Sequence, residues 1–452
     1  MTKEQKSSQP EAPDVSKKVI GAAVIGGALE WYDFGAYALF AAAIGAHFFP
    51  TSNENLSIVL SLMTFAVGFV ARPFGAIVLG AYADRVGRKS VLSLTMLLMA
   101  VGMALIAFCP TYEQFKSFFG FEAAGLLAPL IIVIARLIQG VSAGGEIGSA
   151  LSIIVETAPH HKRGQYAAWQ QVSQTGAFLV AGIVGWLITT TMAPEIVDSW
   201  GWRLAFIFGM LVAPVGFYIR TQISESAEFL EQKEKEKEEA KDNPKTLTIK
   251  DHAKNFMSDI GRYGRFLLIG IGIVIVWTAV SKIASGFMPT YAQKYLGMPK
   301  SSPYVGMIVV GTVLLFCPFI GAWSDKIGRR PIMLGASAAI FIFAYPSFAL
   351  LAAYPYTWVL VLQQLFYAIL MVMYTAPASA MLSEIFPTKF RSSGISLSYN
   401  TAVTFFGGFA PAISVMLISI TGTNIAIAYY IMFAAVISFI ALLFVGKKNP
   451  QE

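Results

Sequence analysis

Long apolar stretches, each about as long as a lipid bilayer is thick, recur along the whole chain and limit how it can fold. Charged residues make up only 13% of the chain, whereas soluble domains carry about 25%. A helix needs about 20 apolar residues to cross the hydrocarbon core, so these stretches predict a polytopic, all-α membrane protein. We expect twelve spans, at residues 19–46, 56–83, 90–110, 126–155, 164–191, 202–220, 264–291, 303–323, 331–352, 357–385, 392–420 and 423–446.

The lysines and arginines between the spans are distributed unequally over the two sides of the membrane. Of the 33 basic residues, 26 fall on the side of the N-terminus, four on the opposite side and three inside spans. Cytoplasmic loops carry the excess of basic residues, so we expect both termini in the cytoplasm and the protein in a bacterial inner membrane. The imbalance also accounts for the net charge of +7 without a nucleic-acid partner, and we expect no removable leader.

Two charged motifs occur twice and divide the chain into related halves. GAYADRVGRK at 80–89 returns as GAWSDKIGRR at 321–330, and ETAPHHKRG at 156–164 returns in related form as EIFPTKFRSSG at 384–394. A mixed-charge stretch separates the spans into two sets of six, as expected for an internal duplication. The expected organisation is an N-terminal tail (1–18), a first half (19–220), a cytoplasmic linker (221–263), a second half (264–446) and a C-terminal tail (447–452).

The repeated motifs predict a latch between the cytoplasmic ends of the halves. Both copies hold an aspartate and a glycine in fixed register, which a plain membrane anchor would not need. An aspartate is stabilised at the positive N-terminus of a helix, and glycine lets two helices approach closely. We expect Asp325 to contact the start of the span after Arg163, and Asp84 the start of the span after Arg391. The residues predicted for this latch are Gly80, Asp84, Arg88, Gly321, Asp325, Arg329, Glu156, Arg163, Glu384 and Arg391.

These motifs resemble those of the major facilitator superfamily. GAYADRVGRK is similar to the signature of the loop between spans 2 and 3, and GAWSDKIGRR is similar to its second-half copy. GGALEWYDFGAY at 26–37 and RLIQGVSAGGEIGSA at 136–150 resemble the metabolite:proton symporter family within it. The resemblance covers all twelve spans. It implies two six-helix halves, a central cavity lined by spans 1, 4, 7 and 10, and import of citrate, 2-oxoglutarate, shikimate, proline or glycine betaine with protons.

Ionisable residues inside the expected spans are candidates for function, because a charge within the membrane is costly. Glu30 and Asp33 in span 1 are three residues apart and share one helix face. We expect one of them to carry the coupling proton and favour Asp33, which lies deeper, with Glu30 as the alternative. A carboxylate placed between apolar surroundings and an arginine can titrate near neutral pH, as coupling requires. For Arg72, a structural ion pair and a role in transport are equally well supported. For Glu146, a structural ion pair is favoured over a role in transport.

The other two buried cations, Arg136 in span 4 and Lys282 in span 7, would face the cavity that the resemblance implies. We expect them to hold a substrate carboxylate, which favours a small organic acid such as a di- or tricarboxylate. A zwitterion such as proline or glycine betaine, held by an aromatic cage and one cation, is the alternative. The polar and aromatic residues expected to complete the substrate site are Gln139, Gln170, Gln174, Tyr32 and Tyr374.

A passive channel and a membrane enzyme are the competing functional classes. A channel needs a filter or a ring of repeated residues, whereas this chain shows a twofold duplication with unlike buried charges. The sequence contains no nucleotide-binding glycine loop, nucleophile elbow or metal-ligand spacing. We therefore expect a transporter and not an enzyme. It should work as a monomer, with the proton gradient as its energy source and with neither cofactor nor metal.

Overall fold

The computed structural model describes residue 28 and residues 31–75, 78–79, 88–144, 151, 154–155, 158, 160–221, 249–387 and 390–446. These residues are almost entirely helical, and none of them lies in a β-strand. Eight of the described helices are long and apolar enough to cross a membrane, and the number rises to ten if each of two bent helix pairs is one span. The predicted all-α membrane fold is confirmed.

Ten of the twelve expected spans coincide with these helices; the other two are represented by the described part of 19–46 and by α12. In the first half the helices are α2 (Ala41–Phe48), α3 (Glu54–Val70), α5 (Arg88–Phe108), α6 (Tyr112–Phe119), α7 (Leu127–Ala143), α9 (Arg163–Ala167), α10 (Trp169–Thr191), α11 (Pro194–Ile196) and α12 (Arg203–Thr221). In the second half they are α14 (Ile249–Lys282), α15 (Met288–Thr290), α16 (Ser302–Leu314), α17 (Cys317–Ile327), α18 (Arg329–Ala353), α19 (Thr357–Ile385), α20 (Arg391–Ala402), α21 (Ala410–Thr421) and α22 (Ile427–Phe444).

The helices bend sharply at two places, within the span expected at 303–323 and just after the span expected at 90–110, and each bend lies at a proline. The axes of the helices on either side of Pro110, α5 and α6, differ by 69°, and α16 and α17 differ by 44°. Pro318 is the second residue of α17. Proline lacks a backbone N–H and clashes with the preceding turn, which interrupts a helix. The span expected at 303–323 is therefore two helices.

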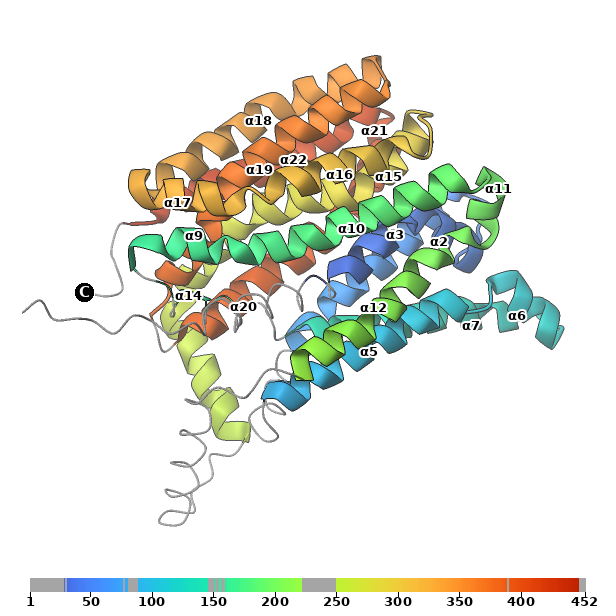
Figure 1. Ribbon diagram of the computed structural model, residues 1–452, viewed down its shortest axis with the longest axis horizontal. Coiled ribbons are helices and arrows are strands. Elements are labelled where there is room, and N and C mark those ends of the chain that lie inside the picture. Colours follow the sequence, from blue (N-terminus) through green and yellow to red (C-terminus); the bar gives the residue numbers. More distant parts are fainter. Residues whose placement is uncertain are drawn as a thin grey trace, which may run out of the picture.

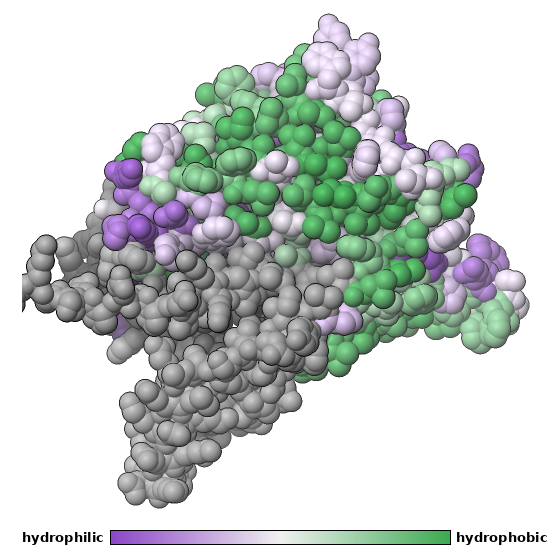
Figure 2. Space-filling view, viewed as in Figure 1, coloured by the Kyte–Doolittle hydropathy of each residue, from purple (hydrophilic) through white to green (hydrophobic). Residues whose placement is uncertain are grey.

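The two halves lie side by side along their length (Figure 1). Helix α10 of the first half packs along α16 of the second, and α3 packs against the short π-helix η7 (Val403–Gly408). Large hydrophobic side chains point outward from most spans. On the face shown in Figure 2 they form an apolar band between more polar ends, as expected for a surface covered by lipid.

Candidate functional site

Asp33, Arg136 and Gln139 form a closed hydrogen-bonded group inside the first half, which we call the Asp33 triad. Arg136 Nη1 donates to Asp33 Oδ2 at 2.7 Å and to Gln139 Oε1 at 2.6 Å. Gln139 Nε2 donates to the other carboxylate oxygen, Asp33 Oδ1, at 2.7 Å. All three side chains are fully buried. Because Arg136 and Gln139 are three residues apart on α7, one helix face presents both groups to the carboxylate.

Glycines on neighbouring helices leave the space that the triad occupies. A Cβ atom at Gly68 of α3 would lie 3.2 Å from Arg136 Nη2, and a Cβ atom at Gly102 of α5 would lie 2.4 Å from Gln139 Cγ. The guanidinium carbon of Arg136 also lies 4.4 Å from the ring centre of Phe34. The triad is thus held in one geometry by close helix packing and by an aromatic face.

A second group of charges gathers around Trp31, and we call it the Trp31 cation pair. The guanidinium carbon of Arg72 lies 4.6 Å from the centre of the Trp31 ring, and Lys282 Nζ lies 4.2 Å from it. Both cations are buried. Arg72 belongs to the first half, whereas Lys282 is the last residue of α14 in the second half. The short π-helix η4 (Ile283–Phe287) follows Lys282 directly, a local irregularity that is frequent at functional sites.

The remaining residues predicted for the substrate site do not form one group but make separate contacts. Gln170 and Gln174 are buried one turn apart on α10, and Gln174 Nε2 donates to the Tyr399 hydroxyl of α20 at 3.2 Å, across the two halves. Tyr32 donates its hydroxyl proton to the carbonyl of Ala205 at 2.8 Å, and Tyr374 donates to a carbonyl of α14 at 2.8 Å. The hydroxyls of these two tyrosines are therefore engaged within one half, where they hold helices together.

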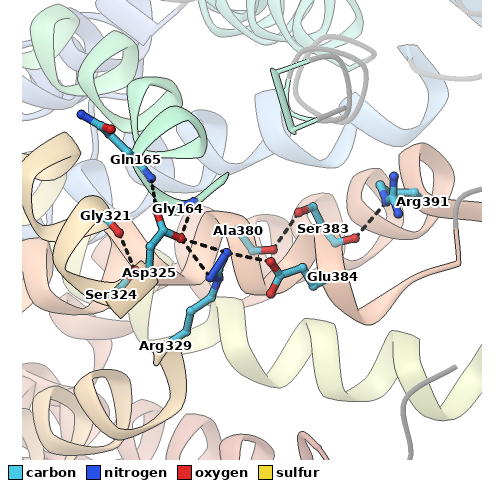
Figure 3. A network of polar contacts seen from close by, with 10 residues as sticks. All are labelled: Gly164, Gln165, Gly321, Ser324, Asp325, Arg329, Ala380, Ser383, Glu384 and Arg391. Atoms are coloured by element: carbon cyan, nitrogen blue, oxygen red, sulfur yellow. Dashed lines mark hydrogen bonds and ion pairs between the residues drawn. The ribbon is translucent and has the colours of Figure 1, made fainter. Parts of the chain in front are cut away.

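Asp325 lies where the repeated motif predicts it, against the start of the helical span that follows Arg163 (Figure 3). Its carboxylate accepts hydrogen bonds from the backbone N–H groups of Gly164 at 2.9 Å and Gln165 at 3.1 Å. Arg329 forms ion pairs with Asp325 at 3.3 Å and with Glu384 at 2.7 Å. This network joins the first half to the second at one end of the bundle, which we call the Asp325 end.

Two glycines bring the backbones together at this end. A Cβ atom at Gly321 of α17 would lie 2.5 Å from the carbonyl oxygen of Gly164, and a Cβ atom at Gly164 would lie 2.8 Å from the carbonyl oxygen of Gly321. The close approach predicted for Gly321 is therefore present. Arg391 lies nearby at the start of α20, where its Nε donates to the carbonyl of Ser383 at 3.0 Å (Figure 3).

The opposite end of the bundle, which we call the Asp198 end, carries contacts that the sequence did not predict. Lys300 Nζ lies 2.5 Å from Asp198 Oδ2, and Lys294 Nζ lies 3.1 Å from Glu54 Oε1. Both ion pairs join the first half to the second. In the sequence, these two lysines are among the four basic residues expected on the side opposite the N-terminus, and nothing in their spacing indicates partners in distant loops.

Several predicted residues fall outside the described part of the chain. These residues are Glu30, Gly80, Asp84, Glu146 and Glu156, and of Arg88 only its place at the start of α5 is described. The proton role of Glu30, the ion pair of Glu146 and the first copy of the latch stay predictions.

Comparisons with known proteins agree with this architecture. The sugar (and other) transporter family matches residues 19–451. The chain is 32% identical to a citrate-proton symporter of Klebsiella pneumoniae, over 94% of this chain and 90% of that protein. It is 33% identical to an ectoine/proline transporter of Corynebacterium glutamicum, over 97% of this chain and 86% of that protein. A partially occluded, inward-open structure of the xylose transporter from E. coli, 19% identical, matches 97% of this chain and 99% of that chain with a TM-score of 0.74. The chain therefore belongs to the sugar (and other) transporter family and has the fold of the major facilitator superfamily.

Proposed function

We propose that this transporter is a proton-coupled symporter that imports a small organic acid by alternating access. Asp33 takes the coupling proton, and the Trp31 cation pair attracts the acid. The proton gradient across a bacterial inner membrane drives uptake, both termini face the cytoplasm, and a monomer without cofactor performs transport. Family membership and similarity to citrate-proton symporters support this function.

The proposed substrate class rests on one observation: Arg72 and Lys282 both contact the indole ring of Trp31. Their distances to the ring centre place the two charges at most about 9 Å apart. A small organic anion with two or three carboxylates can contact both charges at once. Because the two cations belong to different halves, an anion that contacts both also favours closure of the halves around it.

Phe34 connects the proton site to the anion site. Its ring centre lies 4.7 Å from the guanidinium carbon of Arg72 and 4.4 Å from that of Arg136. Protonation of Asp33 removes the negative charge that compensates Arg136, and this raises the attraction of an anion at Arg72 by roughly 1–2 kcal/mol. Proton binding thereby strengthens anion binding. By thermodynamic linkage, the bound anion strengthens proton binding by the same factor.

A zwitterionic substrate is the second candidate, because the ectoine/proline transporter is as similar in sequence as the citrate symporters. The cationic group of a zwitterion is held best over open aromatic faces. In this structure the ring of Trp31 is already in contact with Arg72 and Lys282. The arrangement therefore favours a substrate with net negative charge.

The test is uptake into proteoliposomes with an imposed inward pH gradient. Citrate, 2-oxoglutarate and smaller dicarboxylates are compared with proline and ectoine. We expect accumulation of at least one carboxylate, abolished by a protonophore. Lys282→Gln should raise the KM for that carboxylate about tenfold or more, because a buried charge contact is lost, whereas the control Lys162→Gln, at an exposed position, should leave it unchanged. Accumulation of proline or ectoine without any carboxylate would contradict the organic-acid assignment, and equilibration without accumulation would contradict symport.

A further inference from the structure

Helix α6, between the third and fourth expected spans, is a short and well-defined helix that leaves the direction of the bundle. Thr111 caps its start in a reciprocal capping box with Gln114, and Gly120 ends it in the left-handed conformation, with φ of 76°. Both features fix the helix boundaries locally. The helix turns away from α5 by 69°, and Figure 1 shows it projecting beside the start of α7.

The two faces of α6 differ in polarity. Phe115, Phe118 and Phe119 lie on one side at helical spacing, whereas Glu113 and Ser117 lie on the other. The rings of Phe115 and Phe119 stack with centres 6.3 Å apart, and those of Phe118 and Phe119 lie 5.0 Å apart. The described protein leaves the outer part of this surface uncovered: Phe118 is 82% and Phe119 49% exposed, whereas Phe115 is partly buried against the core.

This aromatic surface is continuous with the lipid-facing surface of the adjoining spans. Phe108 at the end of α5 is exposed, as are Leu126 and Leu127 at the start of α7 and Phe121 just after α6. In Figure 2 the apolar colour extends to the edge of the molecule where Figure 1 shows α6. The only basic residue of the helix, Lys116, pairs with Glu122 at 2.9 Å, so its charge is compensated beside the phenylalanines.

We propose that α6 lies in the lipid–water interface on the predicted external side, with its phenylalanine face in the outer leaflet and Glu113 and Ser117 facing water. A short amphipathic helix with large aromatic side chains on one face is the chemistry that fits this boundary. Its occupant is therefore lipid. Anchored in this way, α6 fixes how deeply the connection between α5 and α7 lies in the membrane. It thereby sets the depth of α7, which carries Arg136 and Gln139 of the Asp33 triad.

Spin labels on the two faces of the helix test this placement. Phe118→Cys labels the aromatic face, and Ser117→Cys is the matched control on the polar face, one residue away. Cys109 and Cys317 are buried and free, and protein without an added cysteine measures background labelling. The labelled proteins are reconstituted into phosphatidylcholine vesicles. The accessibility of each label to oxygen, which concentrates in lipid, is compared with its accessibility to a water-soluble nickel complex.

We expect the oxygen-to-nickel accessibility ratio to be several-fold higher at position 118 than at position 117. Equal, water-like ratios at both positions would show that α6 projects into solvent and would overturn the proposal. Spin–spin broadening at position 118 that disappears when unlabelled protein is added would identify a second copy of the chain as the occupant, and would overturn it as well.

Discussion

Replacing Asp325 by asparagine probes how strongly the Asp325 end holds the two halves together. Asp325→Asn preserves the shape of the side chain and one acceptor oxygen but removes its charge. In the structure the carboxylate is only 7% exposed and accepts hydrogen bonds from the backbone N–H groups of Gly164 and Gln165. The substitution therefore weakens a contact that we expect to exist only while this end is closed.

The size of the effect follows from the burial of this contact. A charge at a helix terminus contributes about 0.3–1 kcal/mol when exposed and up to about 2 kcal/mol when partly buried, so we expect a loss of about 1–2 kcal/mol. A loss of this size multiplies the ratio of open to closed Asp325 ends by about 5–30. Asp198, in contrast, is 64% exposed in its pair with Lys300, and exposed pairs contribute about 0–1 kcal/mol. Asp198→Asn should shift the ratio less, and in the opposite direction.

The assay is a distance measurement between spin labels at Lys162→Cys and Lys326→Cys, two exposed positions beside the contact. In reconstituted Asp325→Asn protein, double electron–electron resonance should show a larger population of long distances than in the wild type. Turnover should fall while substrate affinity is retained, because the residues proposed to bind substrate take no part in this contact. Identical distance distributions in the two proteins would refute the reasoning, as would a larger shift caused by Asp198→Asn.

Three further substitutions test the Asp33 triad. Asp33→Asn should abolish accumulation driven by a pH gradient and spare counterflow exchange in proteoliposomes; undiminished accumulation would remove Asp33 from the coupling step. Arg136→Lys should lower both uptake and the melting temperature, because a point charge replaces a planar donor that bonds two partners; normal values of both would contradict the triad. Gly102→Ala should destabilise the protein by about 1–3 kcal/mol through the clash with Gln139. Gly176→Ala, where no atom lies within 4 Å of the added Cβ, should not destabilise the protein in this way. Equal melting temperatures for the two variants would refute the packing argument.

The parts of the site that sequence predicted are those governed by local rules. Asp325 occupies a fixed place in a repeated motif. Gly164 directly follows two basic residues and begins the span expected at 164–191. An acid in one such motif and an exposed helix start in another attract each other wherever the fold brings the spans together. The resemblance to the major facilitator superfamily supplied that fold, which the structural comparison confirms. The contact could therefore be predicted to within one or two residues.

The partners of the buried cations could not be predicted in the same way. Arg136 was expected to hold substrate, but in this structure it binds Asp33 and Gln139. For Arg72 the sequence supports a structural ion pair and a functional role equally; in the structure Arg72 and Lys282 both contact the Trp31 ring. Helical periodicity gives the face of each helix on which a residue lies, but it does not give the rotation of that helix against its neighbours. That rotation depends on where glycines let helices approach, which is a property of the packed bundle.

The two ends of the bundle hold the halves together by different chemistry, and this difference suits an importer. Among the described residues, the Asp325 end uses a buried carboxylate bonded to backbone groups. The Asp198 end uses ion pairs whose acids, Asp198 and Glu54, are 64% and 80% exposed. Exposed pairs are screened by salt, so the Asp198 end is the weaker closure. An importer needs its external end to open readily to dilute substrate, and its cytoplasmic end to stay closed until substrate and proton are bound. Stronger closure at the predicted cytoplasmic end meets that requirement.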